Sequence, residues 1–156
     1  MHIKLLLLWL PTLKFPTKKM GTPRMATTEL DLTQQPLVYA CSGCSNVAQL
    51  ANDLAVVLDR QGLAQMSCIA GEGGHVKQLL KVAQSGRPIL AIDGCPLNCV
   101  RQSLAQHDIV PTYHLELTSL GYKKQDHQDC SISDAYRLLY QVQTEVLPQL
   151  AAGSKS

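Results

Sequence analysis

The feature that most constrains the fold is a regular alternation between short apolar runs and longer segments with helical periodicity. The alternation predicts strands that pair in parallel through right-handed crossovers, with helices on both faces of the sheet. We therefore expect an α/β fold, a Rossmann-like three-layer sandwich with a mostly parallel four-stranded sheet. The apolar runs lie at residues 37–40, 65–70, 89–92 and 111–117, and the helical segments at 46–60, 76–85, 95–107 and from 133 onward.

Local signals set several of the expected boundaries. The glycine-rich stretch 71–74 is predicted to end the second strand in a turn. Pro96 is expected at the first position of the third helix, where a missing backbone N–H costs nothing. Ser133 is expected to cap the last helix, after a polar loop at 118–129.

The regular pattern begins at residue 36 and divides the chain into three parts. Residues 1–35 contain several prolines and no clear period, and we interpret them as a disordered extension. An alternative is that the natural start lies near Met20 or Met25. The apolar run at 5–10 is too short for a membrane span and lacks the features of a signal peptide. Residues 36–150 are then the folded domain, and residues 151–156 a flexible tail.

Composition narrows the classes of function. The net charge of +2 is too small to indicate nucleic-acid binding, and no aromatic stacking platform is present. With 46% apolar residues the chain can form a hydrophobic core that needs no disulfide bonds for its stability. We therefore expect a function other than disulfide bonding for its six cysteines. We expect a cytoplasmic protein whose cysteines bind a metal ion or carry redox chemistry, with no nucleic-acid or membrane partner.

The cysteines follow the predicted strands. Cys41 and Cys44 come directly after the first strand, and Cys95 and Cys99 after the third. Because parallel strands end at one edge of their sheet, cysteines that are distant in sequence are expected to meet there. A purely structural role, in which the cysteine is a small buried apolar residue, fits Cys68 best because Cys68 lies inside an apolar run.

Two cysteine pairs supply the four thiolates of a tetrahedral zinc site. Gly43 lets the first turn fold back, so that backbone N–H groups face the sulfurs. Cys95 and Cys99 are four residues apart, which places them on one face if the third helix begins at Cys95. Both pairs precede helices, whose N-terminal partial positive charge favours thiolates. The sequence therefore predicts that the domain at 36–150 binds zinc.

The segment Asp93-Gly94-Cys95 resembles the signature of the DGC domain family of zinc-binding proteins, and the resemblance covers residues 36–150. It implies four chelating cysteines, which match Cys41, Cys44, Cys95 and Cys99. The physiological role of the family is undefined, so the resemblance supports metal binding without supplying a reaction. Whether the protein is an enzyme and which protein partner it has stay open.

Three other interpretations use the same residues. The Cys41/Cys44 pair is placed like that of a thiol redox or sulfur-transfer enzyme. The four cysteines could instead hold an iron–sulfur cluster. An enzyme with an open metal position is the third interpretation. Additional ligands would come from Cys68, Cys130 or His75, and supporting contacts from Asp93, Gly94 and Gly43, with Asp93 bonding turn N–H groups.

Overall fold

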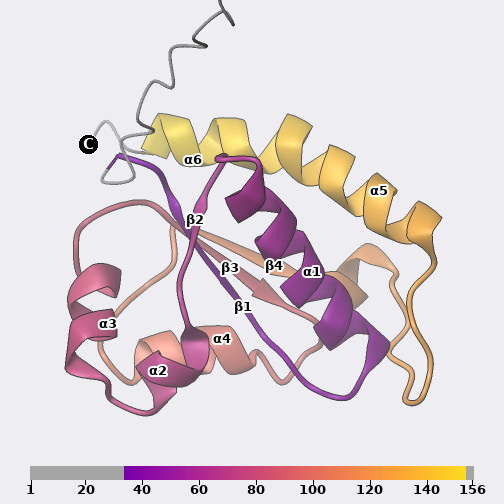
Figure 1. Cartoon of the computed structure of the whole chain (residues 1–156), viewed down its shortest axis with the longest axis horizontal. Helices are drawn as coiled ribbons and strands as arrows, with labels where there is room; N and C mark the ends of the chain where they lie inside the picture. Colours follow the sequence, from indigo (N-terminus) through magenta and orange to yellow (C-terminus); the bar gives the residue numbers. More distant parts are fainter. Residues whose placement is uncertain (1–33, 154–156) are drawn as a thin grey trace, which may run out of the picture.

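The computed structural model describes residues 34–153 (Figure 1). The predicted extension at 1–35, with the alternative start sites, lies almost entirely outside this range. The last helix continues to Gly153, so the first residues of the predicted tail are helical.

All four strands are parallel and lie in the order β2-β1-β3-β4. The strands are β1 (Leu37–Ala40), β2 (Gln65–Met66), β3 (Ile89–Asp93) and β4 (Tyr113–Glu116). The chain leaves β1 toward β2 and then returns to the other side of β1, which is the double winding that the alternating pattern predicts. The α/β class and the parallel sheet are confirmed.

Helices form a layer on each side of the sheet (Figure 1). On one side, α1 (Asn46–Arg60) contacts α5 (Ile132–Gln141), which continues through a π-helical turn at Val142–Val146 into α6 (Leu147–Gly153). On the other side, α2 (Ile69–Gly73) contacts α4 (Cys99–Ala105) and α3 (Lys77–Ala83). A short 3-10 helix, Leu117–Leu120, follows β4.

The two central strands supply the middle of the core. Every residue of β1 and β3 is buried, as expected for parallel strands covered on both faces. Helix α1 packs one apolar face on them, with Leu50, Leu54 and Leu58 at spacings of four residues. The rigid centre of the sheet thus fixes where the loops after β1 and β3 emerge.

The prediction of a strand over 65–70 was wrong at its second half. Strand β2 has only two residues, and Ile69–Gly73 forms helix α2 instead of a turn. Glu72 explains the change, because its side chain is fully buried and accepts a hydrogen bond from the Tyr39 hydroxyl at 3.2 Å. This contact ties α2 to the sheet and outweighs the glycine content of the segment.

The third helix starts later than predicted. Helix α4 begins at Cys99, because Asn98 adopts a left-handed conformation with φ of 51° and Pro96 lies in the preceding turn. Cys95 and Cys99 therefore do not share a helix face. The last helix is capped by Ser131, whose hydroxyl accepts from the Asp134 backbone N–H at 3.1 Å, and not by Ser133.

Candidate functional site

The site lies where β1 and β3 end side by side. These two strands pair through Ala40 and Ile92, and the Cys41 N–H donates to the Ile92 carbonyl at 3.0 Å. Beyond this point the chain turns to opposite faces of the sheet. A crevice at such a topological switch point is where open α/β sheets bind their ligands.

Cys41 is buried directly after the end of β1. It is 8% exposed, and its Sγ accepts a hydrogen bond from the Gly94 N–H at 3.0 Å. Burial raises the pKa of the Cys41 thiol to about 11, and the Gly94 hydrogen bond opposes part of this rise. Negative charge on Asp93, Cys99 and Cys95 raises the pKa further. Cys95 and Cys99 are thus close enough to act electrostatically on Cys41.

Asp93 shapes the loop that carries the other two cysteines. Its carboxylate is 1% exposed and accepts from the backbone N–H groups of Val100 at 2.8 Å and Arg101 at 3.2 Å. These are orphan donors of the first turn of α4, so Asp93 caps that helix from the end of β3. His114 on β4 bonds the same carboxylate through Nε2 at 3.0 Å. The start of α4, and with it Cys99, is fixed to the sheet.

Gly94 is required by a close approach between backbones. A Cβ at this position would lie 2.8 Å from the carbonyl atoms of Val47 and 2.9 Å from the Ala48 nitrogen. The loop after β3 therefore packs directly against the start of α1, which directs the Gly94 N–H at Cys41. Gly43 has no such constraint, since the nearest atom to its Cβ would be 3.8 Å away.

A third loop, residues 121–130 (the covering loop), lies against the start of α1 and reaches Cys95. Asn46 bonds the backbone of this loop at Lys123 and Gln125, and Ser45 forms an antiparallel bridge with Asp126. These contacts bring the Lys124 ammonium to 3.8 Å from the Cys95 sulfur. The edge therefore carries a positive charge next to its thiols.

A comparison with known families agrees with this arrangement. A family model described as the DGC domain matches residues 37–142. The chain belongs to the DGC domain family. It is also similar to the anaerobic and virulence modulator AnvM of Pseudomonas aeruginosa, with 61% identity over 113 residues that cover 72% of this chain and 86% of that protein. No solved structure gives a significant match.

The Asp-Gly-Cys signature of this DGC domain now has a physical explanation. The aspartate caps α4, the glycine permits contact with α1 and bonds Cys41, and Cys95 packs partly buried against the core. The three signature residues therefore hold the two cysteine loops together.

Within residues 34–153, no helix is long and apolar enough to cross a membrane.

The remaining predicted residues are less tightly placed. Cys44 is exposed on the loop after β1, Cys99 is exposed at the start of α4, and Cys130 is half-buried on the covering loop. Cys68 is exposed immediately before α2, and not buried as its apolar surroundings in the sequence indicated. His75 has a left-handed backbone, and its ring packs edge-on against His107 with centroids 4.7 Å apart.

The donor set fits a soft metal ion, since thiolates are preferred ligands of zinc. Among residues 34–153, however, no three His, Cys, Asp or Glu side chains stand ready to hold one ion. The loop between Cys95 and Cys99 also contains an unpaired group, because Asn98 Oδ1 is buried without a hydrogen-bond partner in the described part of the chain. Zinc and iron–sulfur ligation therefore stay predictions.

Sequence reasoning missed the Tyr39–Glu72 pair beneath the sheet. The signal was present, because a tyrosine within a buried strand needs a partner for its hydroxyl. Glu72 was assigned to a turn between glycines, so its burial was not foreseen. The backbone carbonyl of Glu72 also bonds His107 Nε2 at 2.8 Å, which gives that histidine a structural task.

Proposed function

We propose that this protein is a regulatory DGC-domain protein that binds zinc through Cys41, Cys44, Cys95 and Cys99. The observation that carries the proposal is the convergence of the Cys41 loop and the Cys95 loop at the switch point between β1 and β3. The relative from Pseudomonas aeruginosa is named a modulator of anaerobic and virulence traits, which supports a regulatory task.

The chemistry of the edge supports a thiolate site. Four thiolates around one Zn²⁺ leave two excess negative charges, and Lys124 beside Cys95 offsets part of that charge. Cys44 is exposed on the loop after β1 and Cys99 is exposed on the first turn of α4, so both side chains can rotate toward Cys41 without disturbing the core. The left-handed Asn98 and its unpaired oxygen indicate that this loop is not fully satisfied as it stands.

A closed four-thiolate site does not catalyse a reaction, because no coordination position of the zinc ion is left for water or substrate. Its loading would instead fix the loops after β1 and β3, together with the covering loop at 121–130. A surface that is ordered by an ion suits a protein that signals by binding a partner.

Thiol redox or sulfur-transfer chemistry is the second candidate, and the Lys124 contact favours it at Cys95. Cys41 does not support it, because a thiol with a pKa of about 11 stays protonated at neutral pH and is then a poor nucleophile. An iron–sulfur cluster would use the same four cysteines and differs from zinc by its visible absorbance.

The test is a titration of anaerobic, metal-free protein with Co²⁺ and then Zn²⁺, followed by competition with a chromophoric chelator. We expect one ion per chain, thiolate-to-cobalt charge-transfer bands, and a loss of affinity of at least tenfold in Cys95→Ser and Cys99→Ser. Cys68→Ser is the matched control, since Cys68 is exposed and follows the edge strand β2. Equal affinity in Cys95→Ser and Cys68→Ser would reject the assignment.

A further inference from the structure

The outer face of α5 carries a row of apolar side chains that the thiol edge does not use. Ile132, Tyr136 and Tyr140 are 77%, 70% and 70% exposed. Their spacing of four residues places them on one face of the helix, one turn apart. Contiguous apolar surface of this kind marks an interaction site on a protein, whereas isolated exposed apolar residues do not.

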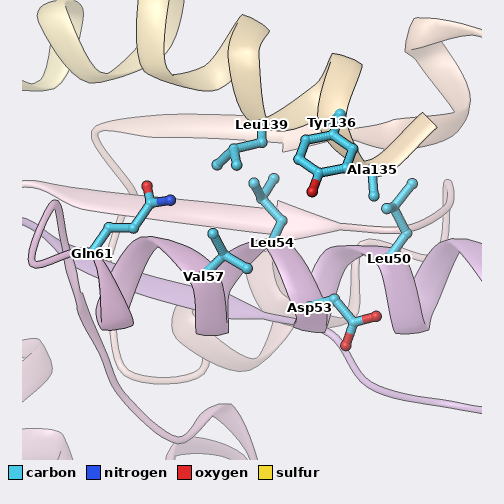
Figure 2. A pocket seen from close by; sticks show the side chains of 8 residues that line it. All are labelled: Leu50, Asp53, Leu54, Val57, Gln61, Ala135, Tyr136 and Leu139. Atoms are coloured by element: carbon cyan, nitrogen blue, oxygen red, sulfur yellow. The ribbon is translucent and has the colours of Figure 1, made fainter. Parts of the chain in front are cut away.

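A groove runs beside this row. It has a volume of about 290 Å³ and lies between α1 and α5. Figure 2 shows the Tyr136 ring at the α5 side of the groove, facing the apolar side chains of α1. The lining residues are Leu50, Asp53, Leu54, Val57, Gln61, Ala135, Tyr136 and Leu139.

We propose that the row and the groove together form the interface of a homodimer in which two α5 helices pack antiparallel around a twofold axis near Tyr136. A raised apolar row and a hollow lie next to each other on the same face. A twofold rotation therefore brings the two rows together in opposite directions, with Ile132 of one copy next to Tyr140 of the other and the rim of each groove beside the partner's row, which is the self-complementary arrangement of an isologous contact.

The charges on this face permit two identical copies to meet. The three residues of the row are uncharged. The nearest ionic groups on α5, Asp134 and Arg137, are already paired with each other at 2.5 Å. A second copy thus meets no unpaired like charge from α5, Asp53 on α1 is the one charged side chain among the residues that line the groove, and a strongly charged partner finds nothing on the row to recognise.

The size of the surface fits a weak, reversible dimer. At their observed exposure, the three side chains of the row offer roughly 350 Å² per copy, to be compared with about 800 Å² per partner in a standard interface. The groove lining adds further apolar surface. We expect a reversible dimer with a dissociation constant on the order of 10 μM.

The experiment is sedimentation-velocity analysis of the full chain over a concentration series, with two charge designs. In the antiparallel arrangement, position 132 of one copy faces position 140 of the other. Ile132→Asp with Tyr140→Asp therefore places like charges together, and Ile132→Asp with Tyr140→Lys places opposite charges together. Val110→Asp is the control, because Val110 is 86% exposed on the loop before β4.

We expect dimers for the unsubstituted chain and for Val110→Asp, and a dissociation constant raised by at least tenfold in the like-charge design. The opposite-charge design should recover a large part of that loss, because the new pairs attract across the axis. A monomeric unsubstituted chain at about 200 μM would overturn the proposal. Equal dimerisation of the two designs would also overturn it. The same holds for zero-length cross-links within a monomer from lysines of residues 1–33 to Asp53, because the groove would then be occupied by a segment of the same chain.

Discussion

Asp93 and Glu72 are both buried carboxyl groups beside the central strands, but they differ in the hydrogen-bond donors that surround them. Asp93 has a donor for each oxygen, from the backbone of α4 and from His114. Glu72 has one donor, the Tyr39 hydroxyl, and its Oε2 has no hydrogen-bond partner within residues 34–153. Burial accordingly raises the pKa of Glu72, and the Tyr39 bond offsets only part of the rise.

The difference shows what each region contributes. The Asp93 region builds a fixed edge, because a fully bonded carboxylate joins β3, β4 and α4 at the place where the cysteines gather. The Glu72 region joins α2 to the sheet through a single side-chain bond, whose strength depends on protonation. We therefore expect substitutions at the edge to have large effects at any pH, and those under the sheet to have small, pH-dependent effects.

Asp93→Asn should cause the largest loss, about 3 kcal/mol of the free energy of unfolding. The amide replaces an acceptor by a donor that faces the N–H groups of α4. Urea unfolding measures the loss, with Asp53→Asn as a control because Asp53 is exposed on α1. A loss no greater than that of the control would show that Asp93 does not hold the edge together.

Gly94→Ala comes next, with an expected loss of about 2 kcal/mol. The added methyl group would overlap backbone atoms of Val47 and Ala48, which cannot move aside as a flexible side chain would. Gly43→Ala is the matched control and should change stability by about 0.5 kcal/mol or less, since its Cβ meets only an ordinary contact. If the two variants unfold alike, the close approach has no energetic weight.

Tyr39→Phe should cost about 1 kcal/mol, because it removes the only donor that the described chain offers to the Glu72 side chain. The pKa of Tyr39 is raised to about 12 by burial, so its hydroxyl remains a donor throughout the measurable range. The pKa of Glu72 should rise further without this bond. Stability should then fall more between acidic and neutral pH than in the unsubstituted protein.

Glu72→Gln should have the smallest effect, on the order of 0.5 kcal/mol, and its sign should depend on pH. The pKa of folded Glu72 lies above the ordinary value of 4.5, so folding binds a proton. That contribution is complete below about pH 4.5 and is lost as the pH rises through the folded value. The glutamine variant lacks this loss, so its stability relative to the unsubstituted protein should increase with pH in thermal unfolding series.

The sequence predicted the class of fold well, because buried strands and amphipathic helices leave strong periodic signals. The placement of Cys41 and Cys95 just beyond two strand ends followed from the same pattern. Prediction from the sequence failed where tertiary contacts outweighed the local conformational preference of a segment. Helix α2 depends on the burial of Glu72, and the late start of α4 depends on Asp93 reaching Val100.

The geometry of the edge was predictable only in part. The predicted strand ends indicated that the cysteines meet at one edge, but the reason for Gly94 lies in α1, which is distant in sequence. The covering loop, with Lys124 next to Cys95, left no recognisable pattern, since polar loops carry no period. Cys68 was misjudged because a short apolar run does not distinguish a buried strand from the start of a helix.

We propose above that the cysteine loops after β1 and β3 hold zinc. The most direct test of this proposal is elemental analysis, with an ultraviolet–visible spectrum, of protein purified anaerobically without a metal-binding tag. We expect about one zinc per chain, no visible absorbance, and loss of the metal in Cys95→Ser but not in Cys68→Ser. Protein that contains no metal while all four thiols react freely would contradict it, and iron with sulfide would assign the same residues to a cluster.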